Sequence, residues 1–141
     1  MRRSKEWVYQ CDHCGKKGRA SGHMRTHERH CTVNPERVCR VCALIPGDAT
    51  ETPLSELKAL VPADVLVEDE YFPGYFRVDT TAHDRELTEA LIAATGHCPA
   101  CMLAVYRQLR IHHGTAFDYK ASMREVLNGV LESEREPDGY Y

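Results

Sequence analysis

The feature that most constrains this chain is its set of seven cysteines, six of which form three Cys-x2-Cys pairs. The set comprises Cys11, Cys14, Cys31, Cys39, Cys42, Cys98 and Cys101. An odd number of thiols leaves one over in a purely disulfide-bonded framework, and the charged amino-terminal residues are not followed by the apolar stretch of an export signal. We therefore expect a reducing, cytoplasmic compartment, where thiolates bind metal. Zinc is the metal that this ligand set favours.

A first zinc site is predicted from the spacing Cys11-x2-Cys14-x12-His27-x3-Cys31. Tetrahedral zinc takes two ligands from a tight knuckle and two from successive turns of one helix. The four-residue step from His27 to Cys31 places both on one helical face. His30 is the alternative fourth ligand, although Cys31 is favoured because its spacing is more usual and thiolates bind zinc well.

The segment from Tyr9 to Cys31 resembles the two-Cys two-His zinc finger, with Cys31 in place of the last histidine. The Tyr-x-Cys opening and Met24 match core positions of that family. Gly18 stands where the family has an aromatic residue, so the core of this finger is expected to be small. The resemblance implies a short β knuckle followed by a helix, that is, a zinc finger of the Cys-Cys-His-Cys type.

The remaining cysteines predict a second zinc site. Two pairs supply it, Cys39 with Cys42 and Cys98 with Cys101, and 55 residues lie between the pairs. With this assignment every thiol belongs to one of two four-ligand sites. Two other interpretations stay open: a redox dithiol at Cys98 and Cys101, which needs a preceding strand, or four simply buried cysteines.

Periodicity predicts a mainly α chain with a small β knuckle, forming a compact zinc-stabilised domain of an α+β zinc finger plus a helical bundle. Two long apolar stripes at helical spacing are expected to form the core. The expected elements are a knuckle at 7–18, a helix from Ser21 to about His30, a short capped helix after Thr52-Pro53, a turn at Pro73-Gly74 within 65–78, a helix ending at Gly96, a helix from Cys98 to near His112, and a helix at 118–134 whose stripe is Tyr119, Met123, Val126, Leu127, Val130 and Leu131.

Charge divides the chain into segments. Residues 1–42 carry ten Lys/Arg against four Asp/Glu, a balance of +6, whereas residues 43–141 carry a balance of −9. We predict a basic zinc-finger segment (1–42), a mostly helical acidic segment that shares the second zinc site (43–134) and a flexible tail (135–141). Segments of opposite charge face different partners or each other.

The basic segment predicts binding to DNA or RNA. Five cations lie on or beside the finger, where they are able to neutralise phosphates: Lys16, Lys17, Arg19, Arg25 and Arg29. The positions that read bases in the related fingers fall on Ala20, His23 and Thr26. Two of these side chains are short, so weak sequence specificity is expected.

A different hypothesis makes the protein an adaptor whose zincs are purely structural. The acidic aromatic region 65–78 would then dock another protein, although packing of some of its aromatic residues against helices is favoured. A thiol redox or zinc enzyme is a third hypothesis. It is disfavoured because the sequence pairs no acid and base with an open zinc position, and His112 and His113 are interpreted as surface residues.

A longer pattern extends the resemblance to most of the chain. It comprises His-x3-Cys-x2-Asn-Pro-x3-Cys-x2-Cys from His27 and, far downstream, Cys-Pro-Ala-Cys-Met-Leu-Ala from Cys98 and Phe-Asp-Tyr-Lys from Phe117. In these features the chain resembles small zinc proteins encoded by bacteriophages and their hosts. The resemblance implies an accessory or regulatory protein and no particular activity. No run of 18 apolar residues occurs, so no membrane span is expected.

Overall fold

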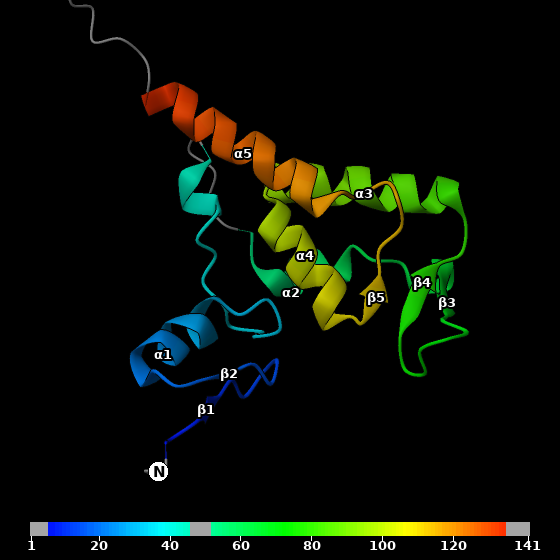
Figure 1. Ribbon diagram of the computed structural model, residues 1–141. Helices are drawn as coiled ribbons and strands as arrows, with labels where there is room; N and C mark the ends of the chain where they lie inside the picture. Colours follow the sequence, from blue (N-terminus) through cyan, green and yellow to red (C-terminus); the bar gives the residue numbers. More distant parts are fainter. Residues whose placement is uncertain (1–5, 46–51, 135–141) are drawn as a thin grey trace, which may run out of the picture.

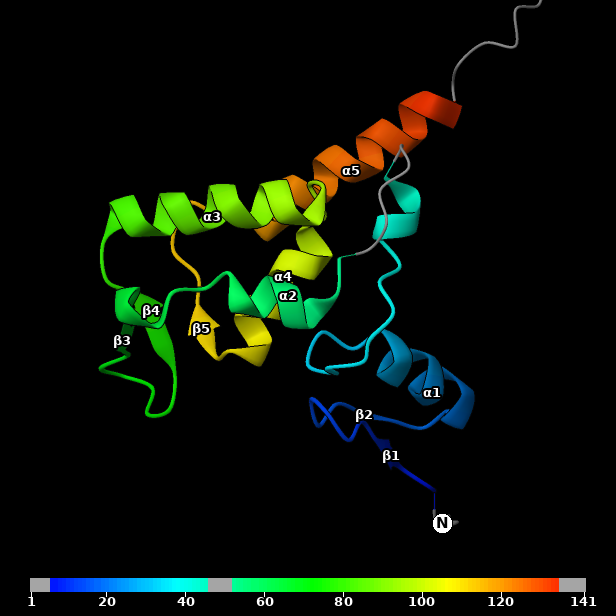
Figure 2. The same ribbon diagram turned by 180° about the vertical axis from the view of Figure 1, so that it is seen from behind.

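The computed structural model describes residues 6–45 and 52–134, in which helices predominate (Figures 1 and 2). The tail expected at 135–141 lies outside these residues. In chain order the elements are β1 (Tyr9–Gln10), β2 (Lys17–Gly18), α1 (Ser21–His30), a 3-10 turn (Cys42–Leu44), α2 (Leu54–Ala59), a second 3-10 turn (Ala63–Val65), β3 (Leu66–Glu68), β4 (Phe76–Val78), α3 (Thr81–Thr95), α4 (Pro99–Gln108), β5 (Ile111–His112) and α5 (Tyr119–Glu134).

The amino-terminal unit, residues 9–31, has the predicted knuckle and helix. Strands β1 and β2 pair antiparallel, and Gly15 closes the turn between them with a φ of 77°, a conformation that glycine adopts without strain. Its core is small, as expected from Gly18, and consists of Cys11, Met24 and Cys31. The terminal methyl of Met24 lies 3.3 Å from the position of a Cβ on Gly18, so Met24 fills the space beside this glycine.

Helix α4 is the centre of the larger, helical unit. Every residue from Pro99 to Tyr106 is buried, because α2, α3 and α5 pack around α4. Cys98 is its N-cap and Pro99 its first residue, as the sequence predicted. Helix α3 ends at Gly96, whose φ of 61° is the left-handed C-cap expected there.

Helix α1 begins at Ser21 as predicted, with Ala20 as an N-cap that has no side-chain hydrogen bond, but two other helix boundaries differ from the predictions. Thr52 does not cap α2, because its hydroxyl donates instead to the Ala94 carbonyl at 2.8 Å. Helix α4 ends at Gln108, and the chain turns at Arg110 with a φ of 56° into β5. The sheet order is β3-β4-β5, in which β4 runs antiparallel to β3 and parallel to β5.

Two predicted core regions are exposed in the structure. On α5, Leu127 and Leu131 are 47% and 49% exposed, because the far end of the helix projects beyond α3 and α4 (Figure 1). In the β3–β4 loop and at the start of β4, none of the four aromatic residues is buried, and Tyr71 is 84% exposed. Packing of these rings against the helices was therefore the wrong expectation. Phe72 and Tyr75 contact the imidazole of His112 instead.

Within the part of the chain that is described, each helix is too short or too polar to cross a lipid bilayer.

Candidate metal centres

The first group of ligands joins the knuckle to helix α1. Cys11 and Cys14 come from the turn between β1 and β2, His27 from the last turn of α1, and Cys31 from its C-cap. The four ligand atoms all lie within 4.8 Å of one another. The Cys14 Sγ is 3.2 Å from the His27 Nε2. These residues are the ones that the spacing predicted.

The structure separates His30 from this group. Its Nδ1 lies 2.6 Å from the Val38 carbonyl oxygen, to which it donates a hydrogen bond. The Cys31 thiol is buried in the small core beside Cys11 and Met24. Of the two alternatives for the fourth position, Cys31 is therefore the one brought to the group.

The second group joins the segment after the finger to the start of α4. The Cys39 Sγ lies 3.5 Å from the Cys98 Sγ, and the Cys42 Sγ lies 3.4 Å from the Cys101 Sγ. The Cys42 backbone N–H donates to the Cys39 sulfur at 3.5 Å, as in a ligand knuckle. Helix α3, and not a strand, precedes Cys98. The layout that a thioredoxin-like dithiol requires is therefore absent from this segment.

Both groups fit a tetrahedral ion. A zinc–sulfur bond of about 2.3 Å places two sulfurs of a tetrahedron about 3.8 Å apart. The sulfur–sulfur separations of 3.4 and 3.5 Å in the second group are close to this value. Each group supplies four soft or imidazole ligands, which is the number that structural zinc sites use. Each is therefore able to hold one metal ion.

Electrostatics within the second group also favour a bound cation. Hydrogen bonds from Cys101 and then Cys98 lower the pKa of the Cys39 thiol far below its ordinary value. Hydrogen bonding to Cys39 and Cys98, together with burial, raises the pKa of Cys101 far above it. One thiolate thus suppresses ionisation of its neighbours. A divalent cation removes this repulsion and lets all four sulfurs bind as thiolates.

The five cations predicted to bind nucleic acid all lie on the surface of the finger. Arg19 forms an exposed ion pair with Glu6 at 3.2 Å. Among the described residues, the other four have no carboxylate partner within ion-pair distance; these are Lys16, Lys17, Arg25 and Arg29. Lys16 and Lys17 lie on the hairpin, and Arg25 and Arg29 lie one turn apart on α1.

Sequence reasoning missed Arg40 and Arg107, which lie beside the finger. The Arg107 guanidinium on α4 donates to the Thr32 hydroxyl at 2.8 Å, although 75 residues separate them in the chain. Arg107 belongs to the segment with the acidic balance, so its charge gave no signal of this position. Only the placement of α4 brings it to the finger.

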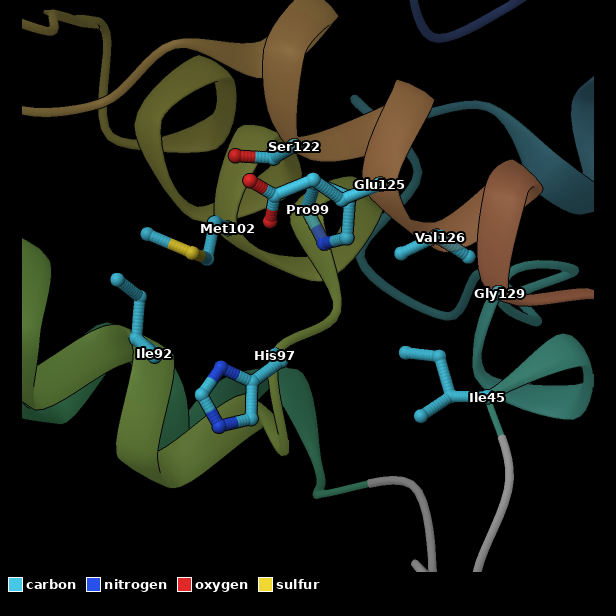
Figure 3. A pocket seen from close by; sticks show the side chains of 9 residues that line it. All are labelled: Ile45, Ile92, His97, Pro99, Met102, Ser122, Glu125, Val126 and Gly129. Carbon is cyan, nitrogen blue, oxygen red and sulfur yellow. The ribbon is translucent and has the colours of Figure 1, made fainter.

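A cavity of about 290 Å³ lies where the α3–α4 turn meets α5 (Figure 3). Ile92 and Met102 form one wall, and Ile45 and Val126 form the other. Glu125 and His97 lie on opposite sides of the cavity, so they do not form an acid–base pair.

No protein-family model matches the chain, and comparison with curated proteins and with solved structures likewise found no match.

Proposed function

We propose that the protein binds two zinc ions, both with a structural role. The first ion would be held by Cys11, Cys14, His27 and Cys31, and the second by Cys39, Cys42, Cys98 and Cys101. Four protein ligands complete a tetrahedral shell, which is the pattern of structural sites and differs from that of catalytic zinc. This argument supports a protein without enzymatic activity.

We propose further that the finger binds nucleic acid. The observation that carries this proposal is the set of exposed cations that have no acidic partner among residues 6–45 and 52–134, namely Lys16, Lys17, Arg25 and Arg29. Uncompensated charges on one small unit attract phosphates. His23 and Thr26 on α1, with Ala20 before it, offer few groups that distinguish bases, so binding is expected to be weakly specific. Such a protein suits an accessory or regulatory role, in a phage or in its host.

The test is fluorescence anisotropy with a labelled mixed-sequence DNA or RNA of about 20 nucleotides. The zinc-loaded protein is expected to bind at 50 mM salt and to weaken steeply by 200 mM. A triple Lys17→Ala/Arg25→Ala/Arg29→Ala variant should lose most of this affinity, whereas Arg85→Ala on α3 should not. If the unchanged protein retains no nucleic acid at 50 mM salt, the proposal is wrong.

A second candidate function is docking of a protein partner. It is supported by the exposed aromatic loop, defined here as Tyr71, Phe72, Tyr75 and Phe76, which lies next to Glu68 and Glu70. Exposed aromatic residues are enriched at protein interfaces. Co-purification from the host with a Tyr71→Ser/Phe72→Ser variant tests it, because loss of a stoichiometric partner would support docking by this loop. Retention of that partner would exclude the loop as the docking surface.

A further inference from the structure

A cleft of about 460 Å³ separates helix α1 from the end of helix α4. Its lining comes from both units of the molecule, the finger and the helical unit. The residues that line it are Lys16, His23, Thr26, His27, His30, Cys31, Thr32, Arg40 and Arg107. Of these residues only Arg107 comes from the helical unit, and the other eight lie within the basic segment 1–42.

The permanent charges that line this cleft are all positive. Lys16, Arg40 and Arg107 contribute three permanent positive charges, and the lining of described residues includes no carboxylate. No Asp or Glu described in the structure lies within ion-pair distance of these three cations. Like charges that share a concave surface raise the local potential and favour an anion.

The two walls of the cleft are held in place. Arg107 is fixed by its hydrogen bond to Thr32. Its neighbour Gln108 donates to the carbonyl oxygens of Thr32 at 3.1 Å and Asn34 at 2.9 Å. Because α4 is the buried centre of the helical unit, these bonds set the guanidinium of Arg107 at a defined position opposite α1. Less ordering is then required when an anion binds.

Two side chains of helix α1 line the same cleft together with Arg107, His23 and Thr26. Both correspond to base-reading positions of the zinc fingers that residues 9–31 resemble, whereas Ala20, the third such position, does not line the cleft. A strand that follows α1 therefore passes the cations of Arg40 and Arg107. We propose that this cleft is a seat for a backbone phosphate of a nucleic-acid strand, an inference that rests on the proposed function of the finger. It makes α4 part of the interface.

The test compares Arg40→Ala and Arg107→Ala with Arg85→Ala, an exposed arginine on α3. Anisotropy is measured from 50 to 300 mM salt with a labelled 20-nucleotide single strand and with its duplex. Loss of one phosphate contact is expected to weaken binding about tenfold at 50 mM salt and to reduce the slope of log K against log salt by about one. Arg85→Ala should leave the affinity and the slope unchanged.

Two additional variants separate the charge of Arg107 from its structural bond. Thr32→Val removes the hydrogen-bond partner but keeps the guanidinium, so the salt slope should stay at the value of the unchanged protein. Arg107→Lys keeps the charge and should preserve the slope, whereas Arg107→Ala lowers it. Arg40 is exposed, so Arg40→Ala removes a positive charge from the cleft without removing a buried side chain.

The outcomes distinguish this inference from the proposed function. If the protein binds nucleic acid and the Lys17/Arg25/Arg29 variant weakens it, but Arg40→Ala and Arg107→Ala keep the original slope, the cleft is not a phosphate seat. If the unchanged protein binds neither probe, both proposals are wrong. A reduced slope in both arginine variants, with unchanged zinc content, supports the cleft.

Discussion

At the start of α3 the imidazole Nδ1 of His83 lies 2.6 Å from a carboxylate oxygen of Asp79. This hydrogen bond raises the pKa of His83, and it lowers the pKa of Asp79. The contribution of His83 to stability is present below its ordinary pKa and is lost as the pH rises through the raised value. The contribution of Asp79 is present above its ordinary pKa and is lost as the pH falls. The ion pair therefore stabilises the fold most in mildly acidic solution, where Asp79 is ionised and His83 is protonated.

Replacing Asp79 by Asn should return the pKa of His83 towards the ordinary histidine value of about 6.5, because the neutral amide no longer stabilises the imidazolium. An NMR titration of the His83 ring protons measures this shift. Asp64→Asn is the matched control, since Asp64 raises the pKa of His83 only weakly and through space. Equal decreases in the two variants would contradict a direct role for Asp79.

At the scale of elements, replacing Gly96 and replacing Gly129 with alanine should have opposite effects on the free energy of unfolding. Gly96 ends α3 with a positive φ, so Gly96→Ala should lower the free energy of unfolding by about 1 kcal/mol. Gly129 lies within α5, where a Cβ would meet no atom within 4 Å, and Gly129→Ala should raise it by about 1 kcal/mol. Chemical denaturation of both variants measures the difference. Destabilisation by Gly129→Ala would show that the space beside α5 is needed.

The elements that depend on local signals were predictable from the sequence. Gly96 stops α3 and Pro99 starts α4 for reasons that lie within a few residues. Strand β5 was not predictable, because Ile111 and His112 form a strand only by pairing with Phe76 and Arg77, which are distant in the sequence. The stripe on α5 predicted a buried face, but Leu127 and Leu131 are 47% and 49% exposed.

The candidate metal centres followed from spacing more directly than the fold did. Ligand pairs with two intervening residues are local signals, and counting them grouped Cys39 and Cys42 with Cys98 and Cys101. The cleft was not predictable. Arg107 meets Thr32 only because α4 packs beside the finger, and no pattern near either residue encodes that contact.

At the scale of the whole molecule, the two candidate centres belong to different cores. Cys39, Cys98 and Cys101 are part of the main core around α4. Cys11 and Cys31 belong to the small core of the finger. A metal ion that joins cysteines about 60 residues apart lowers the conformational entropy of the unfolded chain. By analogy with a disulfide of that span, this effect stabilises the folded state by about 4 kcal/mol. The second centre should therefore dominate stability.

Cys101→Ser and Cys14→Ser should each remove one of the two proposed zinc ions, but with different structural results. Cys101→Ser is expected to abolish cooperative melting and most helical circular dichroism, because it breaks the main core. Cys14→Ser should unfold only the finger and leave α2–α5 intact. Metal content by mass spectrometry and thermal melting test both. Full zinc content with unchanged melting in either variant would refute the ligand role of that cysteine.

Gln108 holds the finger against the helical unit. It donates to Thr32 and Asn34, and it accepts a hydrogen bond from Lys58 at 2.9 Å. Gln108→Ala should weaken this docking by about 1 kcal/mol, since partly buried partners lose their hydrogen bonds. Faster, independent tumbling of residues 9–31 in NMR relaxation would show it. Asn128→Ala, an exposed change on α5, should leave the relaxation of both units alike.

The 59-residue separation of Cys39 from Cys98 also fixes an order of assembly. A ribosome releases the chain from its amino terminus, so the finger has all four ligands once Cys31 has emerged. Cys39 and Cys42 must then wait until translation has produced the start of α4. During this interval the nascent protein has one complete group of candidate ligands and one half-built group, whose two thiols have no partners from α4.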